Sequence, residues 1–297
     1  MMMNILRAEQ AVQYIKSTAR PLEQAIYRHL FEEGEADEVV SALAEYQNAD
    51  GGFGHGLEPD LQTPLSSALT TTNALAILSD LPQSEGLLEM VHRGLSYLAD
   101  TYNEACGGWE IIPEGAEASP RAVWWKYGSF DAFWGNPNAE IAAYFLAFQQ
   151  TYPYAGAASL VRRAIDYLLH TSELTEMHEM LCYLRLYERL DAQQQAELAS
   201  QIERFLDNCV IQDGSEGYGA RPLQIADTPE SQYYSKYEGL IPAELDALIA
   251  AQGEDGAWLP NWDWHQYPEH WPAAREAWKG ILTLNALRTL RAYHRLP

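Results

Sequence analysis

Apolar residues recur along most of the chain at the spacing of an α-helix, and no stretch shows the strict alternation typical of a half-buried strand. Segments around 88–98, 161–169 and 198–206 each carry one apolar stripe and one polar face. A stripe of this kind is typical of a helix that covers a core from outside. The pattern therefore predicts an all-α protein with a surface layer of amphipathic helices.

A second class of segment alternates with the first. The stretches 66–78, 138–148, 177–187 and 279–290 are apolar or small on most faces. A helix that is hydrophobic nearly all round is a buried one. Buried and amphipathic helices that take turns along the chain predict two concentric layers, with an inner and an outer helix in each unit.

A short motif repeats between these helices, with the form Gln-x-x-Asp-Gly-small-aromatic. Its copies lie roughly 40–55 residues apart, or multiples of that, which is typical of a helical repeat architecture. The first copy is "QNADGGF" (47–53), the second is "NEACGGW" (103–109), a looser one is "DGSEGYG" (213–219), and the last is "QGEDGAW" (252–258). A copy without glycines fits near "LLHTSELTEMHEM".

Each copy follows an amphipathic helix, where a glycine at positive φ ends the helix at little cost. We expect the aromatic residue after the glycines to pack back on the helix that has just ended. Long loops follow, and the next helix is predicted to start at a proline. The predicted starts are Thr63-Pro64, Asn136-Pro137, Thr228-Pro229 and Trp271-Pro272. These long loops would then gather at one end of the fold.

The repeated motif resembles the Gln-Trp repeats of the α/α-toroid superfamily of terpenoid cyclases and protein prenyltransferase β-subunits. "DGGFGHGLEPDLQTP" and "EAWKGILTLNALRTLRAY" also resemble uncharacterised bacterial proteins that are often labelled prenyltransferase-like. The resemblance implies one domain over 1–297, with about six inner and six outer helices around a central cavity. The alternative from the residues alone is an open helical solenoid.

The catalytic motifs of that superfamily do not carry over. The chain has no Asp-x-Asp-Asp run, no Asp-Asp-x-x-Asp cluster, and no Asp-x-Cys pair with a later His that would hold zinc. His178 and Cys182 lie four residues apart on one buried helix, but zinc needs three or four close ligands. We therefore predict neither a metal nor a cofactor, and a core role for His178.

The charge of the chain limits its partners. Its 42 acidic and 19 basic residues give a net charge of −23, which disfavours nucleic acid and anionic membrane surfaces. The three cysteines are too few and too scattered for a disulfide framework. No signal pattern and no apolar run long enough to span a membrane is present. A cytoplasmic protein with a small-molecule ligand is predicted, and the oligomeric state stays open.

The first catalytic candidates are His55, Glu58 and Asp60, which follow the first copy and do not recur in the others. An acid and a base side by side are the minimum for proton transfer. The alternative is that these acids only complement the dipole of a following helix.

The second candidates are aromatic. The loops 109–136 and 258–271 hold eight of the nine tryptophans, and such rings can line a pocket or only help a large loop to pack. The predicted ligand-binding residues are Trp124, Trp125, Trp134, Trp262, Trp264, Trp271 and Arg221. Arg221 could bind an anion, or form a salt bridge with a nearby acid.

Acids on later loops could complete a catalytic pair. Glu58 or Asp60 opposite Asp227 or Asp263 would supply the two carboxyl groups of a glycosidase, which lie about 5–9.5 Å apart. Further acids on these loops are Asp131, Glu216, Glu230 and Glu269.

Three functions are compatible with this sequence. The first is a terpenoid cyclase- or prenyltransferase-like protein that holds an apolar or isoprenoid-like ligand in an acidic, aromatic-lined cavity. The second is a carbohydrate-active hydrolase or lyase on the same helical barrel. The third is a non-catalytic binding or scaffold protein.

Overall fold

The computed structural model describes residues 2–215 and 217–297. Within these ranges the chain is helical, with isolated β-bridges and no sheet, which confirms the predicted all-α class. The chain divides into two compact units. Residues 2–42 and 210–297 form unit 1, and Leu43–Cys209 form unit 2. Helix α3 (Ala36–Ala44) contains the boundary between them.

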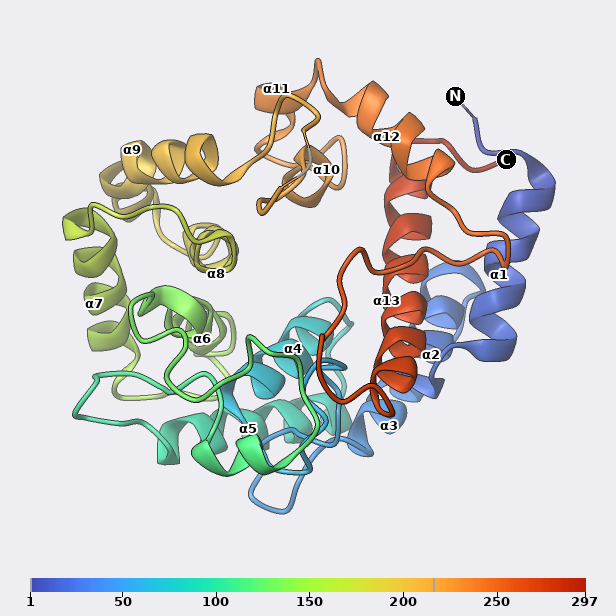
Figure 1. Cartoon of the computed structure of the whole chain (residues 1–297). Helices are drawn as coiled ribbons and strands as arrows, with labels where there is room; N and C mark the ends of the chain where they lie inside the picture. Colours follow the sequence, from blue (N-terminus) through green and yellow to red (C-terminus); the bar gives the residue numbers. More distant parts are fainter. Residues whose placement is uncertain (1, 216) are drawn as a thin grey trace. The chain divides into compact units, whose positions relative to one another are not determined.

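The helices of unit 2 are, in chain order, α4 (Ala68–Ser79), α5 (Glu85–Asp100), η1 (Glu114–Ala118), α6 (Gly135–Ala147), α7 (Ala157–His170), α8 (Met177–Tyr187) and α9 (Ala192–Cys209). They alternate between buried and amphipathic, as predicted. Every residue of α6 from Gly135 to Phe145 is buried, whereas α5, α7 and α9 bury one stripe. Helix α6 packs against α4, α7 and α8, so it lies at the core of this unit (Figure 1).

The helices of unit 1 are α1 (Ile5–Thr18), α2 (Pro21–Phe31), α10 (Pro222–Ile225), α11 (Tyr234–Tyr237), α12 (Ile241–Ala250) and α13 (Trp271–Ala292). Helices α1, α2 and α13 contact one another, so the two ends of the chain lie side by side in this unit (Figure 1). The backbone N–H of Met3 donates to the carbonyl oxygen of Arg295 over 2.9 Å, which joins the terminal segments directly.

Two of the predicted helix starts are confirmed. Trp271-Pro272 opens α13, and Asn136-Pro137, a cis peptide, lies in the first turn of α6.

Thr63-Pro64 is not a helix start, which corrects the prediction. The chain bends at Pro64 and Leu65 and is extended at Ser67, whose N–H donates to the carbonyl oxygen of Phe53 over 3.1 Å. The Ser67 hydroxyl then caps α4 by accepting from the N–H of Thr70 over 3.0 Å. A serine at this position satisfies a free N–H group at the helix start, so the helix begins there instead.

Thr228-Pro229 is also not a helix start. The N–H of Ser231 donates to the carbonyl oxygen of Thr228 over 3.2 Å, which closes a turn. A one-turn helix, α11, follows at Tyr234, and the first longer helix after it is α12. This part of unit 1 therefore has short helices where the pattern predicted a full inner helix.

The repeated motif makes the same contacts in both units. In the first copy, Gln47 Nε2 donates to the carbonyl oxygens of Gly51 (2.9 Å) and Met90 (3.1 Å). In the last copy, Gln252 Nε2 donates to those of Gly256 (2.8 Å) and Arg7 (2.9 Å). The glutamine therefore ties its own turn to a neighbouring outer helix in each case.

The aromatic residue of the motif has a fixed role as well. The backbone N–H of Phe53 donates to the hydroxyl of Thr71 over 3.1 Å, and that of Trp258 donates to the hydroxyl of Thr283 over 3.0 Å. The indole N–H of Trp258 donates to the carbonyl oxygen of Leu248 in α12, the helix that has just ended. This confirms that the aromatic packs back on the preceding helix.

The glycines at positive φ allow a close backbone approach. Gly51 (φ 91°) lies against α5, where an added Cβ would be 2.4 Å from the carbonyl oxygen of Arg93. Gly256 (φ 88°) lies against α1, where an added Cβ would be 2.6 Å from the backbone of Gln10. Helix α1 therefore stands to the last copy as α5 stands to the first, although it lies at the opposite end of the chain.

None of the helices in the described ranges is long and apolar enough to cross a membrane.

Candidate functional site

The loop that carries His55, Glu58 and Asp60 places them in different surroundings. His55 is exposed, and its Nε2 lies 2.8 Å from Oδ1 of Asn48 in the same loop. Glu58 and Asp60 are buried, with 7% and 3% of their surface exposed. Oε2 of Glu58 accepts from Nδ2 of Asn73, 3.1 Å away in α4. The two carboxyl groups therefore belong to the interior of the loop, and the histidine belongs to its surface.

This loop pairs with the tryptophan-rich loop of the same unit. The N–H of Ala122 donates to the carbonyl oxygen of Asp60 (2.8 Å), and the N–H of Gln62 donates to that of Pro120 (3.0 Å). Arg121 fastens the second loop, because its guanidinium donates to the carbonyl oxygens of Trp125 and Glu117, both over 2.6 Å. We name this assembly, residues 53–67 and 109–134, the paired loops.

The paired loops expose apolar side chains. All of unit 2 lies in the described ranges, and its large exposed hydrophobic side chains are Leu65, Val123 and Tyr127, at 44%, 57% and 42% exposure. Trp124, next to Val123, is half-buried. Leu65 lies beside η1, since an added Cβ on Gly115 would be 3.1 Å from its Cδ1. This assembly therefore combines buried carboxyl groups with three exposed apolar side chains.

Most of the other predicted tryptophans pack against aromatic neighbours. Trp125 is buried, and Trp264 is fully buried beside Trp271, with ring centroids 5.7 Å apart. Trp262 meets Trp278 edge to face at 5.1 Å. Trp134 lies against Tyr167 at 5.4 Å. Trp125 and Trp264 therefore contribute to loop packing.

The later candidate residues lie in unit 1, whereas Glu58 and Asp60 lie in unit 2. Asp227 and Asp263 are exposed, and Oδ1 of Asp263 accepts from the N–H of His265 over 2.7 Å. Arg221 forms an ion pair with Glu244, as the salt-bridge interpretation of this residue expected. Glu216 lies outside the described residues.

Glu110 and Asp131 lie near each other within the tryptophan-rich loop. Burial, followed by the charge and hydrogen bonding of Asp131, raises the pKa of Glu110.

The outer helices share a tyrosine that lies outside the repeated motif. It lies four residues after the residue that contacts the repeat glycine, as Tyr14 after Gln10, Tyr97 after Arg93, and Tyr167 after Arg163. Burial raises the pKa of Tyr97 and of Tyr167 to about 12. The constant offset within amphipathic helices is the signal that could have revealed this position from the sequence.

One position of the inner-helix segments holds a different residue in each copy. In each copy, one side chain accepts a hydrogen bond from the backbone N–H of the repeat aromatic, and these acceptors are Thr71, Asn138 and Thr283. The residues four positions earlier, Ser67, Trp134 and Lys279, are therefore equivalent. In unit 1, Lys279 Nζ lies 4.9 Å from the ring centroid of Tyr14. The last copy alone among these three places a cation beside its tyrosine.

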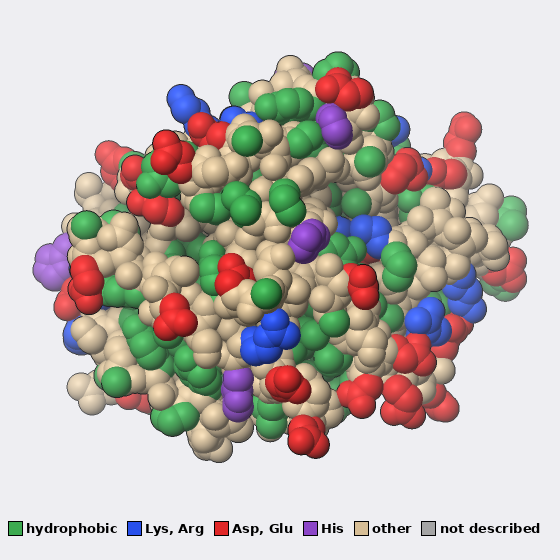
Figure 2. Space-filling view, turned by 90° about the horizontal axis from the view of Figure 1, so that it is seen from below, with side chains coloured by type: hydrophobic (Ala, Val, Ile, Leu, Met, Phe, Trp, Pro, Cys, Tyr) green, Lys and Arg blue, Asp and Glu red, His purple; other side chains and the backbone are tan. Residues whose placement is uncertain are grey.

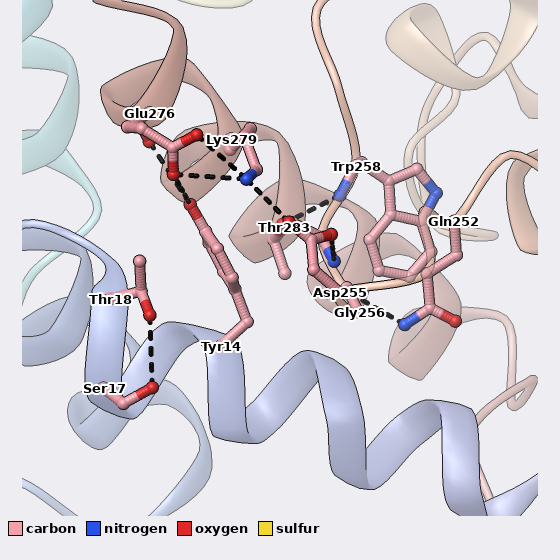
Figure 3. Close-up of polar contacts among 11 residues, drawn as sticks. Tyr14, Ser17, Thr18, Gln252, Asp255, Gly256, Trp258, Glu276, Lys279 and Thr283 are labelled. Carbon is pink, nitrogen blue, oxygen red and sulfur yellow. Dashed lines mark hydrogen bonds and ion pairs between the residues drawn. The ribbon is translucent and has the colours of Figure 1, made fainter. Parts of the chain in front are cut away.

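Lys279 is buried within a charged cluster (Figure 3). Its side chain is 7% exposed, and Nζ donates to Asp255 Oδ2 (2.7 Å) and to both oxygens of Glu276 (3.0 and 3.1 Å). The Tyr14 hydroxyl also donates to Glu276, over 3.1 Å. Burial alone would lower the pKa of Lys279, but hydrogen bonds to Asp255 and Glu276 outweigh it and raise that pKa. The lysine is therefore a permanent cation.

In the second copy a buried acid lies near the equivalent tyrosine. Glu179 in α8 is fully buried, and its Oε1 accepts from the N–H of Gly135 over 2.7 Å. Its Oε2 has no hydrogen-bond partner in the part of the chain that the structure describes. Burial raises the pKa of Glu179 to about 7, with Glu176 adding to the rise and the N–H of Gly135 and the hydroxyl of Tyr167 opposing it. Glu179 thus titrates near neutral pH.

Two surface hollows lie beside the repeat glycines. One of about 890 Å³ is bounded by Asp50, Gly51 and residues of α5, including Glu89 and His92. The other, of about 360 Å³, is bounded by α1, Asp255 and the Lys279 cluster. Their linings correspond in part between the first and last copies, because both include the motif aspartate, Asp50 or Asp255, and two equivalent outer-helix positions, Arg93 and Ser96 or Gln10 and Gln13.

Among residues 2–215 and 217–297, no group of three or more His, Cys, Asp or Glu side chains is placed to hold a metal ion. His178 is exposed, which corrects the predicted core role, and its Nδ1 lies 2.9 Å from Oε1 of Glu176, the residue that caps the same helix. Cys182 is buried, and burial raises the pKa of its thiol.

Comparison of the chain with protein-family models, curated proteins and solved structures found no match.

Proposed function

We propose that the chain is a terpenoid cyclase- or prenyltransferase-like α/α toroid that binds a small apolar molecule at the paired loops. One observation carries the binding proposal. Leu65, Val123 and Tyr127 are exposed on the same assembly that buries Glu58 and Asp60. Ligand sites combine a mostly apolar lining with a few well-placed polar groups.

The toroid is supported by the repeat. Inner and outer helices alternate, and the glutamine and aromatic contacts are the same in the first and last copies, in unit 2 and unit 1 respectively. Helix α1 takes the outer position beside the last copy, as a closed repeat needs and an open solenoid does not. Small-angle X-ray scattering would separate a closed ring from an extended solenoid.

The negative charge of the chain restricts the class of ligand that it can bind. The net charge is −23, and acidic side chains are spread over the face seen in Figure 2, with few basic ones among them. Such a field opposes anionic ligands. The buried carboxyl groups of Glu58 and Asp60 can accept hydrogen bonds from a hydroxyl group. The proposed ligand is therefore an uncharged isoprenoid-like molecule with a hydroxyl head, in preference to a diphosphate.

The experiment compares three probes by isothermal titration calorimetry with the full chain. They are a prenyl alcohol, the matching prenyl diphosphate and an oligosaccharide. We expect the alcohol to bind most tightly, and Val123→Ser and Asp60→Asn each to weaken its binding about tenfold. The first replaces an apolar contact by a polar group, and the second replaces a charged carboxylate acceptor by a neutral amide. Exposed Gln150→Ala is the matched control for a substitution away from the loops.

Tighter binding of the oligosaccharide than of the alcohol would support the carbohydrate-active alternative and contradict this proposal. Alcohol binding that both loop variants leave unchanged would also contradict it. Circular dichroism of each variant separates loss of binding from loss of fold.

A further inference from the structure

The smaller hollow, beside Lys279 in unit 1, is lined by polar and charged side chains, several of which are labelled in Figure 3. Its volume of about 360 Å³ falls within the range of ligand pockets, about 300–1,000 Å³. One wall is the face of α1 that carries Gln10, Gln13 and Ser17, and the other is the cluster of Asp255, Glu276 and Lys279. Every lining side chain carries a polar group.

The charged cluster is not a requirement of the repeat. The positions equivalent to Lys279 are Ser67 and Trp134, both uncharged, and both copies keep the same tyrosine and the same backbone contacts. A buried ion pair is weak evidence for stability, since apolar residues of similar size often do as well. The charges of the last copy therefore call for another reason.

Several polar groups of the hollow can form further hydrogen bonds. Asp255 and Glu276 keep about half of their side-chain surface exposed, 50% and 48%, while Lys279 is buried behind them. The side-chain amides of Gln10 and Gln13 have no hydrogen-bond partner within the described residues. Carboxylate oxygens are acceptors and amide groups are both donors and acceptors. The hollow thus presents both kinds of partner to one small molecule.

Three ligand classes fit poorly. An anion would meet two carboxylates and a lysine whose contacts go to them, in a chain of net charge −23. A metal ion would lack a third acidic, His or Cys ligand among the residues that the structure describes. An apolar molecule would find no aliphatic side chain in the lining.

We infer that this hollow is a binding site for a small uncharged polyhydroxy compound, such as a monosaccharide or a cyclitol. Its hydroxyl groups would donate to Asp255 and Glu276 and accept from the amides of Gln10 and Gln13. Lys279 orients the two carboxylates and neutralises one of them. The site is independent of the paired loops, which lie in unit 2.

Saturation-transfer NMR on the full chain, with glucose, myo-inositol and glycerol as probes at millimolar concentration, tests this inference. We expect glucose or myo-inositol to bind, and Gln13→Ala and Glu276→Gln each to weaken that binding about tenfold, since the first removes an amide group and the second replaces a charged carboxylate acceptor by a neutral amide. Gln13 is exposed on α1, so its replacement by alanine leaves the packing intact.

The matched control is Ser96→Ala, because Ser96 occupies on α5 the position that Gln13 occupies on α1. It should leave binding unchanged. The inference is overturned by a wild-type chain that binds none of the three probes. It is equally overturned by binding that persists at full strength in Gln13→Ala, or that Ser96→Ala weakens as much.

Discussion

The first and last copies of the motif use the same backbone contacts but surround their tyrosines differently. Gln47 and Gln252 each bridge a turn to a neighbouring helix, and Gly51 and Gly256 each lie against a helix backbone. Beside these contacts, the first copy has Ser67 where the last has a buried Lys279. The geometry of the repeat therefore resides in groups that bond to the backbone, which leaves the position beside the tyrosine free to vary.

The second copy has Trp134 at that position, and its tyrosine lies near a buried acid. Tyr167 has Glu179 of α8 nearby, whereas Tyr14 has a lysine and its two carboxylates. The tyrosines of these two copies thus lie near a buried acid in unit 2 and a compensated cation in unit 1. This difference predicts that a change in pH alters the stability of the two units by unequal amounts.

The largest effect is expected from alanine at the repeat glycines. Gly51→Ala and Gly256→Ala each combine a positive φ with a Cβ that meets backbone atoms at 2.4 and 2.6 Å, so each should lower the free energy of unfolding by about 4 kcal/mol. Urea unfolding measures this. Gly214→Ala is the control, because its φ is also positive but nothing lies within 4 Å of the added Cβ. An equal loss in all three variants would contradict the close-approach explanation.

The next effect is the pH dependence of unit 2. The pKa of Glu179 is raised from 4.5 to about 7, so its contribution to stability is full below pH 4.5 and is lost as pH rises through about 7. Glu179→Gln should therefore match the wild type near pH 5 and exceed it by up to about 3 kcal/mol near pH 9. Hydrogen exchange of α8 at both values measures it. A difference that does not change with pH would exclude titration of Glu179 as its source.

A smaller effect should come from the repeat glutamines. Gln47→Ala and Gln252→Ala each remove two hydrogen bonds to backbone carbonyl oxygens, so each should cost about 2 kcal/mol by urea unfolding. The exposed Gln150→Ala should cost almost nothing. A clearly unequal loss of unfolding free energy at the two repeat positions would contradict the equivalence of the first and last copies.

The smallest effect is expected at Lys279. Lys279→Met should change the free energy of unfolding by no more than about 1 kcal/mol at neutral pH, because equivalent positions hold uncharged residues and the carboxylates left behind are half-exposed. Thermal unfolding by circular dichroism measures it. A loss of several kcal/mol would mean that the cluster serves stability, which would remove one argument for a ligand beside it.

Much of the fold could be predicted from hydrophobic periodicity and the repeated motif. The alternation of buried and amphipathic helices in 66–206 is confirmed. The prediction that the repeat glycines end the helices is wrong, because α5 and α12 end at Asp100 and Ala250, several residues before Gly107 and Gly256. Two proline starts were wrong because side chains and turns nearby, such as the cap at Ser67, outweigh the preference of proline for a first helical turn.

The candidate site could be predicted less well. The unusual acids after the first copy were singled out, but composition alone could not show that Glu58 and Asp60 are buried while His55 is exposed. Glu179 and Lys279 were not selected as site residues, because burial near a tyrosine depends on contacts between distant segments. The spacing of the three tyrosines was the available clue.

The place of α1 has a consequence for the order in which the chain can fold. Arg7 donates to the carbonyl oxygens of Ile249 (3.1 Å) and Gln252 (2.8 Å), so its partners leave the ribosome some 240 residues after it. During synthesis the face of this helix that contacts α13 stays uncovered, while the middle of the chain can already assemble. Helix α1 is thus among the last to complete its contacts, and because that step joins residues far apart in sequence it is expected to be slow.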